Sequence, residues 1–183
     1  MSVIQFLINR QSNGFLTTPA PNETALHNII NAAVAVPDHG GLTPYHFHII
    51  QGAGLDKLTN IYIRAIKAVT DDSLKIAKAQ KMAYRAPLMI VISTKFKQHP
   101  KVPKQEQLIT AGCAAQAMQM AAVAQGFGAM WRTGDLAYSD IVKSGLGIAL
   151  DEEIVGFLYI GTKTKELPIK NRTLCDDHID YWR

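Results

Sequence analysis

The sequence predicts a single α+β domain in which helices flank a mixed β-sheet. Three observations point to this class. The chain has 183 residues, enough for one sizeable core. Residues 87–94 and 154–161 are apolar runs of the kind that form buried strands. Helical patterns separate the strand candidates without a regular β-α-β rhythm. Since no repeat, low-complexity tract or linker divides the chain, we expect one domain over residues 1–183.

Six segments are predicted as helices: 2–10, 23–36, 55–69, 73–83, 104–125 and 138–144. Asn22 is suited to cap the second helix, and the sequence 37–41, with one proline and two glycines, ends it. The helix 104–125 is the longest and is rich in Ala and Met nearly all round. We therefore expect it to be central or at an interface.

Four segments are predicted as strands: 46–51, 87–94, 129–132 and 154–161. The first contains the β-formers Phe47, Ile49 and Ile50. Residues 87–94 are apolar in sequence, as expected for a strand that is buried on both faces. We expect a polar loop over residues 11–21 and an irregular polar tail from Lys163 onward.

Composition narrows the class of protein. Hydrophobic residues make up 48% of the chain and charged residues 19%, as in an ordinary globular domain. The net charge of +4 favours small anionic ligands, but the lysines are too dispersed to predict nucleic-acid binding. We find no signal peptide, and the most apolar stretch, 111–124, is too short to span a bilayer. Cys113 and Cys175 match no metal spacing or disulfide framework. A cytoplasmic protein without a metal, nucleic-acid or membrane partner is expected.

The most informative segment is Gly126–Gly134, with the sequence GFGAMWRTG. Its glycines allow the backbone to approach a flat ligand, and Trp131, Arg132 and Thr133 offer a stacking face, a charged fork and a hydroxyl. The alternative is a plain helix C-cap followed by a strand. The segment lacks the third glycine of the dinucleotide fingerprint and follows a helix instead of opening one. A Rossmann-type NAD domain is therefore not predicted.

Arg10 and Ser12 form a second candidate site. A guanidinium and a hydroxyl two residues apart can hold a phosphate, although a solvated helix end would have the same residues. The adjacent pair Asp38 and His39 is not predicted as a catalytic dyad, because neighbouring loop residues usually point apart. His39 itself is either a ligand contact or a solvent-facing residue.

His46 and His48 share one face of the first predicted strand and could form part of a metal site. No third ligand is evident in the sequence, so ordinary strand histidines are the favoured interpretation.

Taken together, Arg10-x-Ser12, the sequences 36–39 and 44–47, the Ala/Met-rich helix and the segment 126–134 resemble the FMN-dependent nitroreductase family, most closely its minimal members. The similarity runs nearly end to end, through residues 154–161. The resemblance implies a nitroreductase-like α+β fold, a homodimer, and FMN in a cleft built by both subunits. It also implies NADH or NADPH as electron donor and a small-molecule acceptor, such as a nitroaromatic or a quinone.

The resemblance also implies roles for individual residues. Those implied to contact FMN are Arg10, Gln11, Ser12, Trp131, Arg132 and Thr133 of one subunit, with Pro37 and His39 reaching the flavin of the partner subunit. Those implied to contact the nicotinamide cofactor are Ala121, Ala122, Val123, Ala124, Gln125 and Gly126. The chemistry is expected to be centred on the flavin, with no catalytic side chain and no metal.

The chain departs from the family pattern in three places. Phe15 replaces a second arginine, and Thr43 and Tyr45 stand where Gln and Trp are usual. The basic residues expected near the C-terminus for the phosphate have only candidates: Lys163, Lys165 and Arg172. We therefore expect a modest FMN affinity and a different substrate preference. Two alternatives stay open: another flavin reaction, such as reductive dehalogenation or flavin cleavage, and a non-redox basic module that binds nucleotides.

Overall fold

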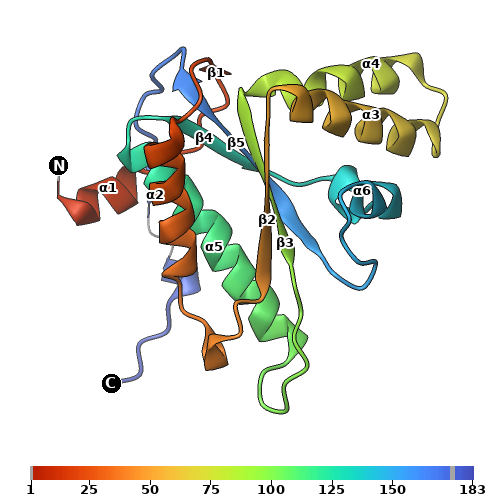
Figure 1. The fold of residues 1–183 in the computed structure, drawn as a ribbon. Helices are drawn as coiled ribbons and strands as arrows, with labels where there is room; N and C mark the ends of the chain where they lie inside the picture. The colour runs from red at the N-terminus through yellow and green to blue at the C-terminus, as the bar shows by residue number, and fades with distance from the viewer. Residues whose placement is uncertain (1, 174–175) are drawn as a thin grey trace.

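Five strands form one sheet in the computed structural model, which describes residues 2–173 and 176–183. They are β1 (Leu16–Thr17), β2 (Tyr45–Gln51), β3 (Leu88–Thr94), β4 (Gly128–Arg132) and β5 (Ile154–Lys163). Their order is β1-β5-β3-β2, and β4 also pairs with β5 (Figure 1). The sheet is thus organised around β5, which contacts three other strands.

The predicted α+β class is confirmed, and all four strand pairings are antiparallel. The expected mixture of directions is therefore absent between neighbouring strands in the described ranges. The connections explain this result. After β2, the hairpin of α3 (Ala53–Lys67) and α4 (Ser73–Met82) takes the chain out and back, so β3 runs opposite to β2. A single helix, α5 (Lys104–Ala124), joins β3 to β4, which run in the same direction but are separated by β5.

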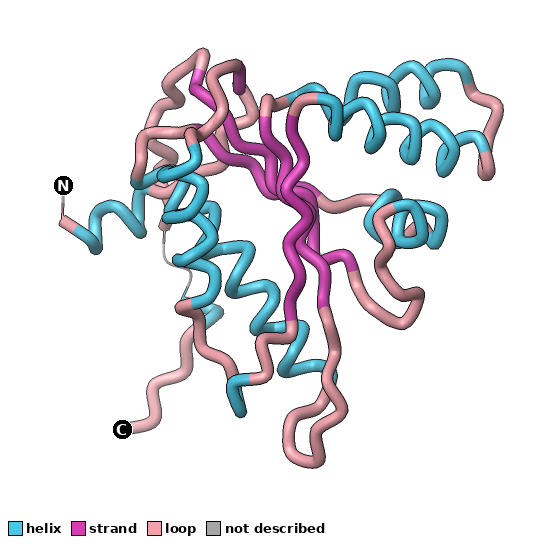
Figure 2. The backbone as a smooth tube through the Cα atoms, viewed as in Figure 1, coloured by secondary structure: helices cyan, strands magenta, loops and turns pink. Residues whose placement is uncertain are grey.

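Side chains of β3 alternate between the two faces of the sheet. Leu88, Ile90 and Ile92 pack against α5 and α2 (Glu23–Val34). The intervening Met89 and Val91 belong to a second cluster, which also includes residues of α3, α4 and α6 (Asp140–Gly145). Figure 2 shows the resulting three layers, with helices on both sides of the strands. Because both faces of β3 are buried, its sequence has no polar alternation.

Helix boundaries follow local signals closely. The side chain of Asn22 accepts a hydrogen bond from the Ala25 amide at 2.9 Å, so the predicted cap is confirmed. The first helix, α1 (Val3–Asn9), buries none of its residues. β1 lies within the predicted loop, because a strand of two residues has no periodicity to detect. The described residues also include four short 3-10 helices: η1 (His39–Gly41), η2 (Ala83–Arg85), η3 (Asp135–Tyr138) and η4 (Asp176–His178).

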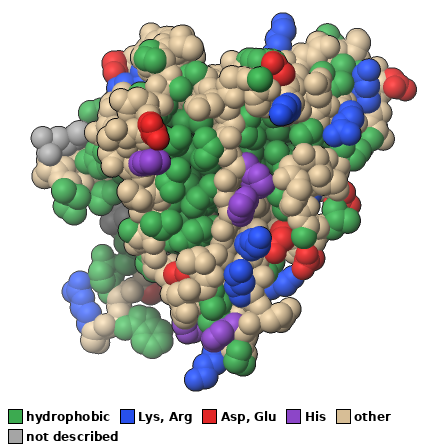
Figure 3. Space-filling view, viewed as in Figure 1, with side chains coloured by type: hydrophobic (Ala, Val, Ile, Leu, Met, Phe, Trp, Pro, Cys, Tyr) green, Lys and Arg blue, Asp and Glu red, His purple; other side chains and the backbone are tan. Residues whose placement is uncertain are grey.

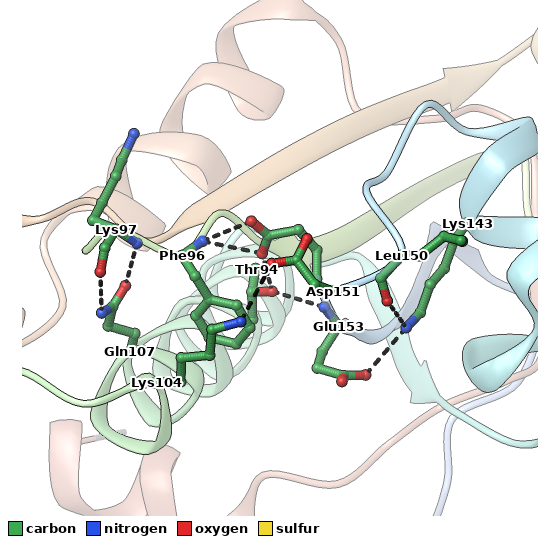
Figure 4. Close-up of polar contacts among 10 residues, drawn as sticks. Thr94, Phe96, Lys97, Lys104, Gln107, Lys143, Leu150, Asp151 and Glu153 are labelled. Atoms are coloured by element: carbon green, nitrogen blue, oxygen red, sulfur yellow. Dashed lines mark hydrogen bonds and ion pairs between the residues drawn. The ribbon is translucent and has the colours of Figure 1, made fainter.

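Polar contacts join the end of β3 to the turn before β5 (Figure 4). The Thr94 hydroxyl donates to the Glu152 carboxylate at 2.5 Å and accepts from the Glu153 amide at 2.8 Å. Lys143 is buried on α6, and its Nζ donates to the Leu150 carbonyl at 3.2 Å and lies 3.6 Å from Glu153. These contacts hold α6 and the turn against the sheet, so the position of β5 is well defined.

No helix in the described ranges has both the length and the apolar character that a bilayer crossing requires. Likewise, residues 2–173 and 176–183 bring no three metal-ligating side chains together. Cys113 is a half-buried free thiol on α5, whereas Cys175 lies outside the described residues.

Candidate active site

Arg10 and Ser12 lie against α5 at a buried amide. The Nη1 atom of Arg10 is 3.5 Å from Ser12 Oγ and 3.5 Å from Gln119 Oε1. Gln119 Nε2 is 3.3 Å from both Ser12 Oγ and the Ala129 carbonyl oxygen. Gln119 is not among the site residues predicted from the sequence. The signal was present, however, because a long polar side chain on the buried face of a helix must find hydrogen-bond partners.

Gln11 presents an unpaired acceptor next to this cluster. Its Nε2 donates to the carbonyls of Leu167 and Pro168 at 3.1 and 3.0 Å. Its Oε1 is buried and has no hydrogen-bond partner among the described residues. A buried acceptor without a donor costs roughly 1–3 kcal/mol. A ligand with hydroxyl groups beside Arg10 would relieve this cost.

The three basic candidates near the C-terminus have different surroundings. Lys163 lines a cavity of about 290 Å³ together with Arg10 and Gln11, and it forms an ion pair with Glu166 at 2.5 Å. Arg172 donates instead to backbone carbonyls, at 3.0 Å to Ile8 and 2.7 Å to Arg10. Lys165 lies 5.5 Å from the centre of the Phe15 ring. Of the three, only Lys163 lines the cavity beside Arg10.

A larger cavity of about 550 Å³ lies between α4 and the end of β4. It contains aromatic and sulfur-bearing side chains together with four cations and one acid. Its lining includes Met82, Met130, Phe157, Tyr159, Lys75, Lys78, Arg85, Arg132, Asp135, Thr133 and Gly134. Such a volume, with an apolar floor and a few charged groups, suits a small aromatic ligand.

The loop 10–14 connects the two cavities. Arg10 and Gln11 line the smaller one. Gly14, four residues after Arg10, lies so close to β4 that an added Cβ would be 2.8 Å from Met130 Sδ and 3.3 Å from Arg132 Nη2, two residues that line the larger cavity. The close approach explains why glycine is present here. One elongated ligand could therefore follow this loop from a phosphate position at Arg10 to a ring position near Arg132.

The predicted trio at the end of β4 is split between the two faces of the sheet. Arg132 faces the larger cavity, and its guanidinium carbon lies 5.9 Å from the centre of the Tyr159 ring. The Trp131 indole packs with the α2/α5 cluster, and its Nε1 donates to the Val155 carbonyl at 3.2 Å. Thr133 lines the larger cavity. The alternation of the strand thus turns the Trp131 indole away from the Arg132 side chain, although Trp131 is also among the residues that line the larger cavity.

Tyr159 lies on the floor of the larger cavity. Burial raises the pKa of its hydroxyl, even though the nearby Arg85 and Arg132 act in the opposite direction. The hydroxyl is therefore neutral at physiological pH.

Pro37 and His39 lie at the other end of α5. His39 Nδ1 is 2.6 Å from Glu106 Oε2, and Thr110 Oγ1 donates to the Pro37 carbonyl at 3.3 Å. Glu106 and Gln119 are separated by thirteen residues of one helix, a distance of about 20 Å along its axis. Within one chain, His39 is therefore far from the Arg10 cluster.

The segment proposed for the nicotinamide, residues 121–126, covers the last turn of α5 and its cap. Ala122 is fully buried against the sheet. The Gln125 amide is occupied by α2, because its Nε2 donates to the Ala25 carbonyl at 3.2 Å and its Oε1 accepts from Asn28 at 3.2 Å. The negative end of the helix dipole does not favour a dinucleotide's phosphates here. The nicotinamide assignment stays a prediction.

One surface between α2 and β2 is apolar. Figure 3 shows hydrophobic side chains gathered there over α5. On α5 itself, Leu108 and Ile109 are 39% and 58% exposed, although the opposite side of the helix is buried in the core. This helix was predicted to be apolar nearly all round. In the structure, one of its sides packs into the core, and the side with Leu108 and Ile109 is exposed.

The two strand histidines lie side by side, but the described residues place no third metal-ligating side chain with them. The rings of His46 and His48 lie 4.6 Å apart between centroids. Burial, and secondarily His46, lower the pKa of His48, and its buried Nε2 has no hydrogen-bond partner in the described part of the chain.

Residues 10–162 match the model of the Nitroreductase family. The chain belongs to the nitroreductase family. It is 43% identical over 162 residues, 88% of each chain, to a protein of Escherichia coli (strain K12) provisionally named NAD(P)H nitroreductase YdjA. The predicted family, its α+β fold and the assignment as an oxidoreductase enzyme are confirmed.

Solved nitroreductase structures share the fold. A nitroreductase-like family protein from Bacillus cereus superimposes with a TM-score of 0.85 at 24% identity, covering 100% of this chain and 96% of that one. A nitroreductase with bound FMN from Bacteroides fragilis NCTC 9343 gives a TM-score of 0.74 at 20% identity, covering 100% of both chains.

Proposed function

We propose that this nitroreductase is an FMN-dependent NAD(P)H oxidoreductase that reduces nitroaromatic, quinone or similar acceptors by ping-pong turnover. One observation supports it above the others. The Arg10–Ser12–Gln119 cluster continues along the loop 10–14 into a cavity with an aromatic floor. The loop 10–14 thus links residues of the smaller cavity to two residues that line the larger one, an arrangement that suits a cofactor with a phosphate at one end and a flat ring at the other.

The residues present fit FMN. Arg10 and Ser12 would hold the phosphate with a charge-assisted bond and a hydroxyl, and the unpaired Gln11 Oε1 would accept from a ribityl hydroxyl. Arg132 and Thr133 would lie beside the ring. Bound FMN supplies the hydride-transfer chemistry, so the protein needs no acid-base residue for that step. The Bacteroides fragilis structure contains FMN, and the Escherichia coli relative is named for NAD(P)H, which supports both cofactors for this chain.

The kinetic order follows from the shape of the site. The larger cavity has a single aromatic floor, formed by Phe157 and Tyr159. A donor and an acceptor that both reach a flavin ring in this cavity have to occupy the remaining space in turn. We therefore infer that the oxidised nicotinamide leaves before the acceptor binds, and that double-reciprocal plots at varied acceptor concentration are parallel.

A homodimer with shared sites completes the proposal. The apolar side of α5 with Leu108 and Ile109 offers an interface for a second copy. His39 lies about 20 Å along α5 from the Arg10 cluster of its own chain. In a dimer, Pro37 and His39 would contact the flavin of the partner subunit.

The first experiment identifies the cofactor. Purified protein should be yellow, and heating should release FMN, identified by chromatography. FAD, or no flavin after reconstitution, would contradict the proposal. Replacement of Arg10 by Ala removes a charge-assisted contact and should weaken FMN binding by about 1.5–3 kcal/mol. Arg64 on α3 lines neither cavity, so Arg64→Ala is the matched control.

A turnover assay then tests the reaction. NADH or NADPH oxidation should depend on an added nitroaromatic or quinone, with parallel double-reciprocal lines. Intersecting lines would indicate a ternary complex. Release of halide, or consumption of the flavin itself, would favour one of the alternative flavin reactions.

A further inference from the structure

The larger cavity contains more positive charge than a flavin ring requires. Lys75 and Lys78 are exposed on α4 and lie three residues apart, so they share the face of that helix that borders the cavity. Arg85 and Arg132 line it as well, against the single acid Asp135. None of the four cations forms an ion pair with another described residue. The cavity therefore has an excess positive charge without counterions.

The flavin phosphate does not supply the missing counterion. Arg10 lines the smaller cavity, whose lining includes neither Lys75 nor Lys78. A phosphate bound at Arg10 would therefore lie in a different cavity from the one that Lys75 and Lys78 line. Like charges around a partly enclosed, apolar-floored site attract an anion more strongly than they would in open water. A second anionic group, different from the cofactor phosphate, is expected at α4.

We propose that the electron acceptor is a small aromatic anion, such as a nitroaromatic carboxylate, whose carboxylate pairs with Lys75 and Lys78 while its ring lies in the same cavity, beside the flavin ring. The reduction step rests on the proposed function. The cavity of about 550 Å³ has room for a small acceptor. It is less suited to a dinucleotide, whose 2′-phosphate lies far from the reacting nicotinamide ring. In the reaction, NAD(P)H and one proton provide two electrons and two protons to the nitro group. One N–O bond breaks, water leaves, and a nitroso compound and NAD(P)⁺ are formed.

Binding is measured first, so that the result does not depend on turnover. Equilibrium dialysis of the flavin-loaded protein against 4-nitrobenzoate and its neutral methyl ester gives the ratio of their affinities. The wild type should prefer the acid, and the preference should weaken as salt is added. Lys75→Gln and Lys78→Gln should each lower the acid-to-ester ratio by up to about fivefold, and the double variant should lower it further.

Lys81 provides the control. It lies on α4, three residues after Lys78, but does not line the cavity. Lys81→Gln changes the net charge by the same amount, so it should leave the ratio close to the wild-type value. An equal loss in Lys81→Gln, an unchanged ratio in the double variant, or no preference for the acid in the wild type would each overturn the anion site.

Turnover separates the two proposals. If both compounds are reduced and the preference for the acid depends on the lysines, both proposals stand. If neither is reduced but binding of the acid still depends on the lysines, the anion site stands and the nitroaromatic activity fails. If the ester is reduced as well as the acid in every variant and binding shows no preference, the proposed function stands and the anion site fails.

Discussion

Gln119 Nε2 lies 3.3 Å from Ser12 Oγ, although the two residues are 107 positions apart in the sequence. The same amide group contacts Arg10 and the Ala129 carbonyl, so one buried side chain joins the N-terminal loop, α5 and β4. The position of the proposed phosphate-binding residues therefore depends on a helix residue that is itself 2% exposed.

Replacement of Gln119 by Leu keeps most of the side-chain volume but removes these hydrogen bonds. The buried Ala129 carbonyl retains its bond from the Asn13 amide at 2.9 Å, whereas Ser12 and Arg10 lose a partner. We expect the free energy of unfolding to fall by about 1–3 kcal/mol and FMN affinity to fall with it. Urea unfolding and flavin titration measure both. Gln116→Leu, at an exposed position on the same helix, is the control; equal losses in the two variants would contradict the role of Gln119.

Gly156→Ala should be strongly destabilising. A Cβ at this position would lie 2.0 Å from Trp131 Nε1, and the indole is held by its bond to the Val155 carbonyl. Overpacking of this kind costs typically 1–3 kcal/mol. Thermal or urea unfolding measures the loss. Adding Trp131→Phe, which removes the crowded nitrogen, should recover part of it, and a purely additive double variant would show that the indole is not the cause.

His48 should make stability depend on pH. Burial, with a smaller effect of His46, lowers its pKa in the folded state below the ordinary value of 6.5. The unfolded chain therefore binds a proton at a higher pH than the folded protein. The contribution of this residue to stability is complete above about pH 6.5 and is lost as the pH falls from there toward the folded-state pKa.

Comparison of wild type with His48→Gln isolates this effect, because the other histidines are present in both proteins. The free energy of unfolding should fall less steeply below pH 6.5 in the variant. In His46→Gln the neighbouring charge is absent, so the His48 effect should be smaller than in wild type. Parallel pH profiles of wild type and His48→Gln would show that the folded protein does not lower this pKa.

Much of the fold was predictable because its signals are local. The apolar run of β3 and the Asn22 cap each depend on residues within a few positions. The directions of the strands were not predictable in the same way. The direction of a strand depends on whether a helical hairpin or a single helix connects it to the preceding strand. No local sequence pattern predicts which connection forms. β1 depends on pairing with the end of β5, which is distant in sequence.

The residues of the candidate site also fall into two groups: those that local sequence signals predict, and those that only the folded chain brings together. Arg10 and Ser12 were recognisable because they stand two residues apart, and the structure keeps them together. The lysines of α4 were not recognisable as site residues, because only the folded chain brings that helix beside β4. Trp131 lines the same cavity as Arg132, but its indole packs with the α2/α5 cluster, because adjacent strand residues point to opposite faces; its contact with FMN stays a prediction.

The final prediction concerns the partner subunit. His39 and Arg10 contact α5 near its two ends, about 20 Å apart, so one flavin would need each residue from a different chain. Sedimentation at micromolar concentration should give about twice the chain mass of 20.1 kDa. Homodimers of Arg10→Ala or of His39→Ala should bind FMN weakly at both sites. Mixed dimers should regain binding at one site in two, because that site combines the intact Arg10 of one chain with the intact His39 of the other. The Arg64→Ala subunit, mixed with Arg10→Ala, controls for general effects of subunit exchange. A monomer that retains FMN, or mixed dimers that bind no better than either parent, would show that each chain builds its own site.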